Sequence, residues 1–162
     1  MKKIKAQNIS KKSFCAFGDI LDINGSPDKL INAGFCERYN DRAKLEFTNG
    51  KAGISIFHAK VRKLPYKFDM LERHPDGSQA FLPLSSNPFL VIVAKNNTKN
   101  EPHEPQAFIT APSQGINIHR NIWHGVLAPL NSPGIFAVID RIGPGDNLEE
   151  YFLSEKFEVE LY

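Results

Sequence analysis

Residues 68–84 read FDMLERHPDGSQAFLPL, and the pattern of this stretch indicates a β fold. From Phe68 to His74 the side chains alternate, as expected for a strand that presents successive residues to opposite faces of a sheet. Asp76-Gly77 is a turn signal, and an apolar run follows it. The stretch therefore predicts two strands joined by a tight turn, with Gln79 reaching back toward His74 across a hairpin.

Further strands are expected on both sides of this stretch. Segments 54–61, 106–111 and 135–142 are rich in β-branched and aromatic residues, which favour strands. Phe89 to Ala94 is a continuous apolar run, the pattern of a strand buried on both faces. Turn signals separate the segments: Asn49-Gly50, Asn87-Pro88, Asn96-Asn97, Ser132-Pro133-Gly134 and Gly143-Pro144-Gly145-Asp146. Short strands at this spacing predict an all-β jelly-roll type of barrel.

Little helix is expected in this chain. Residues 11–17 follow Ser10, which is a suitable N-cap residue, and predict one short helix. Residues 96–105 are polar and bounded by proline, so we expect an exposed loop there.

Composition limits the classes of function. With 162 residues, the chain has the length of a single domain, 1–162, with a core of its own. The net charge is +2 and the basic residues form no stripe, which argues against a nucleic-acid partner. No apolar run is long enough to span a bilayer. Cys15 and Cys36, the only two cysteines, form no zinc motif, so free thiols in the cytoplasm are expected.

Polar residues gather around the turn in the opening stretch. Alternation places Glu72 and His74 on one face of the strand and Arg73 on the other. Gln79 comes directly after the turn. Polar groups between apolar flanks are costly to bury unless they bind each other, a metal or a substrate. A catalytic pocket is the functional interpretation, and a polar network that only fixes the strand register is the structural one.

A second polar cluster follows later in the chain. His119 and His124 are five residues apart, so a regular strand would place them on opposite faces, and they are not expected to act as a pair. Trp123 could form a wall of the pocket or fill the core. Asp140 and Arg141 are neighbours in a predicted strand, so only one of them should point inward, and Arg141 is the favoured one.

Several segments resemble the bacterial ureidoglycolate lyase family of the allantoin pathway. The likeness extends from about Phe14 to Phe152. It is strongest in the block from Leu71 to Leu84. The residues that carry it are Phe35-x-Glu37-Arg38-Tyr39-x-Asp41, Leu71-Glu72-Arg73-His74-Pro75-x-Gly77-Ser78-Gln79-Ala80-Phe81-x-Pro83-Leu84, Gln106-Ala107-Phe108-Ile109, Gln114-Gly115-Ile116-Asn117-x-His119-Arg120-Asn121-x-Trp123-His124 and Asp140-Arg141-x-Gly143-x-Gly145-Asp146-Asn147. One position departs, because the family commonly has a second histidine where this chain has Gly125.

The resemblance implies a cupin-like β-barrel, a homodimer, and cleavage of (S)-ureidoglycolate to glyoxylate and urea. It also implies a divalent metal, nickel or manganese, at the positions that bind metal in cupins. These positions correspond here to Glu72, His74, Gln79 and His124, with His74, Gln79 and His124 as the expected ligands. The usual carboxylate ligand has become an amide at Gln79.

The chemistry of this substrate fits the residue types. Cleavage needs a base, an acid and a cation that holds the substrate carboxylate. We assign Glu72, His74 and His124 to catalysis. The expected substrate-binding residues are Arg38, Gln79, Arg120, Trp123 and Arg141. A metal-dependent oxygenase or isomerase and a non-catalytic small-molecule-binding barrel are the alternatives.

Overall fold

The computed structural model describes residues 1–161, which are mostly β-sheet. Its elements are β1 (Lys2–Lys5), β2 (Gln7–Asn8), α1 (Lys11–Phe14), β3 (Gly18–Leu21), β4 (Lys29–Ile31), η1 (Asn32–Gly34), β5 (Cys36–Arg38), β6 (Lys51–His58), β7 (Tyr66–Arg73), β8 (Gln79–Pro83), β9 (Phe89–Asn96), β10 (Pro102–Ile109), β11 (Gly115–Ile118), β12 (Trp123–His124), β13 (Ala128–Pro129), β14 (Ile135–Ile142) and β15 (Glu149–Glu160).

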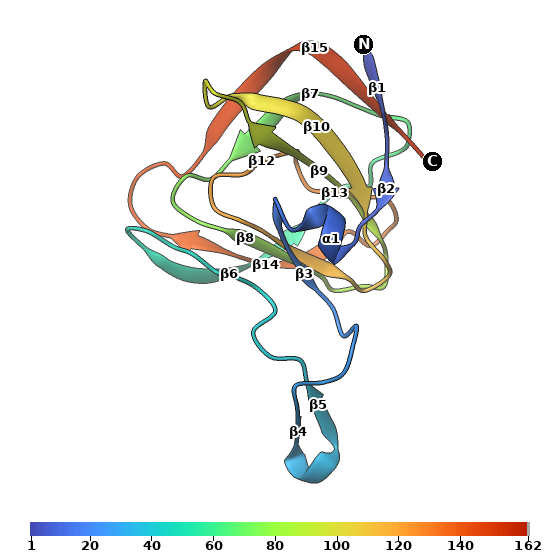
Figure 1. Cartoon of the computed structure of the whole chain (residues 1–162), viewed down its shortest axis with the longest axis vertical. Coiled ribbons are helices and arrows are strands. Elements are labelled where there is room, and N and C mark those ends of the chain that lie inside the picture. The colour runs from blue at the N-terminus through green and yellow to red at the C-terminus, as the bar shows by residue number, and fades with distance from the viewer. Residues whose placement is uncertain (162) are drawn as a thin grey trace.

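Two sheets form a nearly closed barrel (Figure 1). The first sheet has the order β1-β15-β7-β12-β9-β10-β2, with β13 also paired to β9. The second sheet has the order β3-β11-β8-β14-β6. The predicted all-β, jelly-roll type of barrel is confirmed.

The interior between the two sheets is apolar. Its core cluster combines Phe89, Val91 and Val93 of β9 with Phe81 of β8 and Phe136 of β14, among others. The Phe89 and Phe136 rings meet edge-on with their centroids 5.1 Å apart, a favourable aromatic arrangement. Burying one such side chain contributes roughly 2–3 kcal/mol, so this interior anchors the ends of the strands that surround it.

Strand β9 is buried on both faces, as its apolar run predicts. Leu90, Ile92 and Ala94 alternate with the interior residues and belong to a second core cluster. Leu71 and Trp123 are in this second cluster as well. The two clusters define an inner and an outer face for the central strands of the first sheet.

Three local predictions about the strands need correction. Strands β7 and β8 do not form a hairpin, because they lie in different sheets. The strand expected at 54–61 is β6, which begins and ends three residues earlier, at Lys51 and His58. Strand β10 begins at Pro102, so the loop predicted at 96–105 is limited to residues 97–101, and Pro102 and His103 pair with β9.

The predicted helix is present but shorter than expected. α1 ends at Phe14, and Ser10 caps it by accepting a hydrogen bond from the Ser13 amide. Within residues 1–161, no helix is long and apolar enough to cross a membrane.

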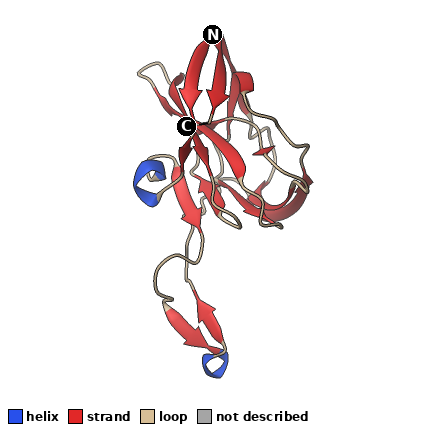
Figure 2. Ribbon diagram, turned by 90° about the vertical axis from the view of Figure 1, so that its right-hand side faces the viewer, coloured by secondary structure: helices blue, strands red, loops and turns tan. Residues whose placement is uncertain are grey.

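A two-stranded arm projects away from the barrel (Figures 1 and 2). It consists of β4 and β5 with η1 between them. The chain that returns from the arm is fixed at Lys44, whose amide donates to the Asp19 carboxylate over 2.8 Å. Asn117 donates both to this carboxylate and to the Lys44 carbonyl. No pattern in the sequence predicts this arm.

Candidate active site

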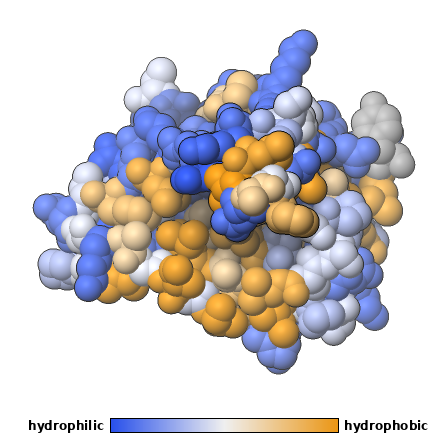
Figure 3. Space-filling model, turned by 90° about the horizontal axis from the view of Figure 1, so that it is seen from below, coloured by the Kyte–Doolittle hydropathy of each residue, from blue (hydrophilic) through white to orange (hydrophobic). Residues whose placement is uncertain are grey.

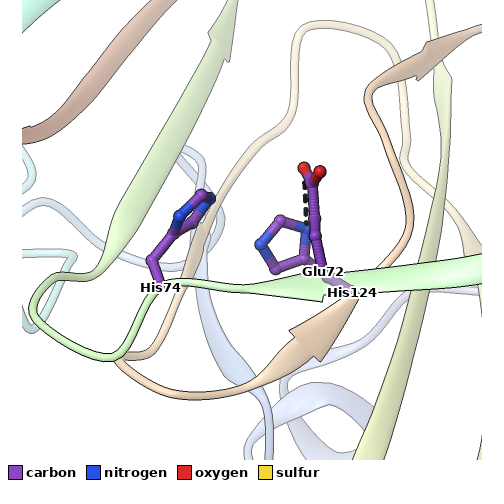
Figure 4. A group of neighbouring side chains, drawn as sticks. All are labelled: Glu72, His74 and His124. Carbon is purple, nitrogen blue, oxygen red and sulfur yellow. Dashed lines mark ion pairs between the residues drawn. The ribbon is translucent and has the colours of Figure 1, made fainter. Parts of the chain in front are cut away.

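Glu72, His74 and His124 come together at one end of the barrel (Figure 4). Each contributes one possible ligand atom, and these atoms lie within 4.8 Å of one another. The two imidazole rings have centroids 5.2 Å apart, and Nδ1 of His124 is 3.9 Å from Oε1 of Glu72. The structure thus brings together the three residues that were expected to be catalytic.

Strand pairing explains why these side chains converge. The short strand β12 lies between β7 and β9, so that His124 is opposite Glu72 on one side and Val93 on the other. Val93 points into the inner core cluster, and directly opposed residues share a face of the sheet. Glu72 and His124 therefore face the barrel interior, and His74 follows two residues after Glu72.

Backbone carbonyls fix the tautomers of both histidines. Nδ1 of His74 is 2.6 Å from the Asn147 carbonyl, and Nδ1 of His124 is 3.1 Å from the Gly125 carbonyl. A carbonyl only accepts, so each Nδ1 carries the proton and each neutral ring has its lone pair on Nε2. Both Nε2 atoms are buried and have no hydrogen-bond partner among residues 1–161.

Burial controls the charges in the site. Desolvation, together with the nearby His74, lowers the pKa of His124 to about 3, against the weaker opposing effect of the Gly125 carbonyl. His124 is therefore neutral at pH 7. Desolvation raises the pKa of the Glu72 carboxyl; His74 opposes this shift and Glu150 adds to it. Glu72 is thus better suited to exchange protons near neutrality than an ordinary glutamate.

The three residues fit a divalent metal ion. Two buried, unpartnered imidazole lone pairs and one carboxylate form a donor set that several first-row metals accept. In addition, each histidine is oriented by a carbonyl at its other nitrogen, as metal-binding histidines commonly are.

Gln79 lies on the second sheet rather than across a hairpin from His74. Its side chain is buried, and its amide Nε2 donates to Asp140 over 3.4 Å. The expected contact with His74 is not made. Its Oε1 is buried and has no partner in the described chain.

Trp123 lies on the face opposite to His124. It belongs to the outer core cluster, and the guanidinium carbon of Arg73 lies 4.3 Å from the centre of its ring. Arg73 in turn is bound by Glu149. These contacts give Trp123 a packing role, and its predicted contact with substrate stays a prediction.

The three candidate arginines are in different environments. Arg141 does not point inward as favoured, because Phe136 and Val138 face the interior and regular pairing along β14 places Asp140 on that face instead. The Arg141 guanidinium donates to the carbonyls of Thr48, Asn49 and Pro144. Three of its five N–H donors are therefore already occupied by backbone carbonyls.

Arg38 and Arg120 are both exposed. Arg38 is on β5 of the arm. Arg120 is in the turn before β12, where the amide of Asn121 donates to the His74 carbonyl over 3.0 Å. The segment that carries Arg120 is thus in contact with the three-residue site, as is the 140–147 segment that carries Arg141, through the Asn147 carbonyl. His119 is not paired with His124; its Nε2 is 3.0 Å from the Asp19 carboxylate.

Gly125 is compatible with an intact site. Its amide donates to the Ile92 carbonyl, and a Cβ added at this position would lie 3.1 Å from Cβ of Ile92. Ile92 is in the outer core cluster. A side chain at position 125 would therefore point away from His124, and the change to glycine removes nothing from the three-residue site.

Comparison with known proteins agrees with these features. The family model described as ureidoglycolate lyase matches residues 1–160. The chain belongs to the ureidoglycolate lyase family. A relative named ureidoglycolate lyase from Rhodobacter capsulatus is 53% identical over 161 residues, which is 99% of each chain. Relatives with the same name are 48% identical in Mesorhizobium japonicum, over 99% of each chain, and 42% identical in Agrobacterium fabrum, over 96% of this chain and 95% of the relative.

Membership of the ureidoglycolate lyase family confirms the resemblance read from the motifs and makes this protein an enzyme of that kind. It does not favour the oxygenase, isomerase or binding-protein alternatives. Two contributors to the site were not assigned from the sequence: the Asn147 carbonyl, which orients His74, and Asp140, which binds Gln79. Both are in the motif at 140–147, and only their position in the fold shows what they contact.

Proposed function

We propose that this protein is a lyase that cleaves (S)-ureidoglycolate to glyoxylate and urea. The observation that carries the proposal is the Glu72–His74–His124 group in a chain that matches this family from end to end. Membership of the family indicates the substrate, and the site contains proton-exchanging groups of the kind that cleavage of this substrate needs.

Glu72 is the proposed proton carrier. In ureidoglycolate one carbon carries a hydroxyl, a carboxylate and the ureido nitrogen. Glu72 takes the hydroxyl proton, the oxygen forms a carbonyl, and the electron pair of the breaking carbon–nitrogen bond stays on nitrogen. Glu72 then returns the proton to this nitrogen and releases urea. The raised pKa of Glu72 suits both halves of this transfer.

His74 and His124 would hold a divalent metal, with Glu72 close enough to serve as a further ligand; the Nε2 atoms of both histidines are buried and have no hydrogen-bond partner in the described chain. When bound at these residues, a metal of this kind, nickel or manganese by the family resemblance, would supply Lewis-acid polarisation of the substrate hydroxyl. The protein itself orients both histidines through backbone carbonyls, and burial keeps His124 neutral.

Arg120 is the proposed partner of the substrate carboxylate. An arginine binds a carboxylate through two parallel hydrogen bonds. Arg141 already donates three hydrogen bonds to backbone carbonyls through Nε and Nη2, whereas Arg120 is exposed on the turn that contacts His74.

The products distinguish this function from its alternatives. We expect purified protein to release glyoxylate and urea in equal amounts from (S)-ureidoglycolate. Colorimetric assays of glyoxylate, urea and ammonia on the same sample measure this. Ammonia without urea would show an amidohydrolase, and no release with nickel or manganese added would contradict the proposed activity.

We also infer that the protein forms a homodimer through the outer face of its second sheet. Ile54, Ile56 and Leu84 are 74%, 64% and 57% exposed there. Apolar side chains spread over this underside around the projecting arm (Figure 3). Phe35, next to the tip of the arm, is 93% exposed. A second copy would cover both surfaces, because a two-fold interface lets each arm contact the partner's sheet.

Sedimentation tests this surface. We expect Ile56→Asp to convert a dimer to a monomer, because the charge would be buried without a partner. Phe152→Ser is the matched control: Phe152 is 72% exposed but lies on β15 of the other sheet, and the control should remain a dimer. A monomeric wild-type protein would contradict the inference.

We further infer a cytoplasmic location, because Cys15 and Cys36 are both free, as is usual in a reducing compartment.

A further inference from the structure

The second sheet contributes two polar residues to the barrel interior. Phe81 and Val138 belong to the inner core cluster. Gln79 lies two residues before Phe81 on β8, and Asp140 lies two residues after Val138 on β14. Because strand residues two apart share a face, Gln79 and Asp140 point into the same interior. The pairing of Ile139 with Ala80 makes them neighbours across the two strands.

Gln79 and Asp140 lie at the same end of the interior as the three-residue site. The edge-on pair Phe89 and Phe136 joins the two sheets toward the other end. Four residues farther along β9 is Val93, which is opposite His124. Four residues farther along β14 is Asp140. His124 of the first sheet and Asp140 of the second sheet are therefore at a similar distance along the barrel from the Phe89–Phe136 pair.

The contact with Asp140 determines which way the Gln79 amide faces. Only the NH2 group can donate to a carboxylate, and Nε2 of Gln79 is the atom bound to Asp140. The amide is planar, so its oxygen points away from Asp140. This Oε1 atom is buried and has no partner in residues 1–161. A buried acceptor without a partner costs free energy unless a ligand supplies a donor.

We propose that Asp140 is a positioning residue that fixes the Gln79 amide so that its oxygen accepts a hydrogen bond from an N–H of the bound ureido group. The inference rests on the proposed function for the identity of the ligand. Without Asp140, the Gln79 side chain could turn either its oxygen or its NH2 group toward the substrate. The Asp140 carboxylate accepts from the NH2 group, so only the oxygen faces the substrate. The pair would thus select substrates that carry N–H donors at this point.

A double-mutant cycle tests the pair. The ureido group is present before and after bond cleavage, so losing this contact should act mainly on KM. We expect Gln79→Leu and Asp140→Asn each to raise KM by roughly 5- to 10-fold, with kcat within about threefold of wild type. The double variant should resemble Gln79→Leu alone, because Asp140 acts only through Gln79. A further loss on adding Asp140→Asn to Gln79→Leu would overturn the positioning role.

Controls separate the pair from folding and from the proposed reaction. Asp146→Asn changes an exposed aspartate and should leave KM unchanged, and melting curves identify any variant that does not fold. If Asp140→Asn does not fold, Asp140→Ser replaces it in the cycle. The Gln79 side-chain amide signals in a ¹⁵N–¹H spectrum, assigned by their loss in Gln79→Leu, should shift in Asp140→Asn without any substrate. Unchanged signals would show that Asp140 does not position the Gln79 amide. Shifted signals in a protein that does not cleave ureidoglycolate would overturn only the proposed reaction.

Discussion

His124→Ala should lower kcat for ureidoglycolate cleavage by at least ~10²-fold, in line with the loss of a metal ligand or proton-transfer group. The reason is geometric: His124 is 2% exposed, its Nε2 has no hydrogen-bond partner in the described chain, and its Nδ1 lies 3.9 Å from Oε1 of Glu72. Steady-state kinetics of the purified variant measure the effect.

A matched histidine separates site chemistry from general effects of losing an imidazole. His103 has a side chain that is 60% exposed, and His103→Ala should keep wild-type kcat. Circular dichroism establishes whether His124→Ala is folded. Normal turnover by a folded His124→Ala protein would show that this histidine is structural.

Arg141→Ala should lower the free energy of unfolding by about 3 kcal/mol or more, because hydrogen bonds to charged groups contribute about 1.5–3 kcal/mol each. Its guanidinium holds the carbonyls of Thr48, Asn49 and Pro144, and the variant leaves these acceptors without their donor. Urea denaturation measures the change.

Substitution of Arg120 by alanine should affect substrate binding and not stability. Arg120 is exposed, so Arg120→Ala should change stability little and raise KM roughly tenfold by losing the substrate carboxylate. A normal KM for Arg120→Ala together with a raised KM for stable Arg141→Ala would return the carboxylate site to Arg141.

Alternation and apolar runs predicted much of the fold. The continuous run from Phe89 to Ala94 identified a strand buried on both faces, and the alternation from Phe68 to His74 placed Glu72 and His74 together. Such patterns succeed because a strand has a fixed period of two residues. The convergence of His124 with these two residues depends on the pairing of β12 with β7, which the strand patterns alone do not specify.

Other features could not be read from one sequence. The run from Ile135 to Ile139 is apolar at every position, so it has no alternation to show that Asp140, and not Arg141, faces inward. The turn after His74 resembles a hairpin turn, but its two strands enter different sheets, because sheet pairing is determined by distant segments. The arm is built from two strands of three residues, too short for a periodic signal.

Parallel measurement of glyoxylate and urea released from (S)-ureidoglycolate by wild-type and His124→Ala protein tests most directly whether the Glu72–His74–His124 group cleaves this substrate. We predict equal amounts of the two products from the wild-type protein and release at least ~10²-fold slower from the variant. Equal rates from both proteins, or ammonia in place of urea, would contradict the account.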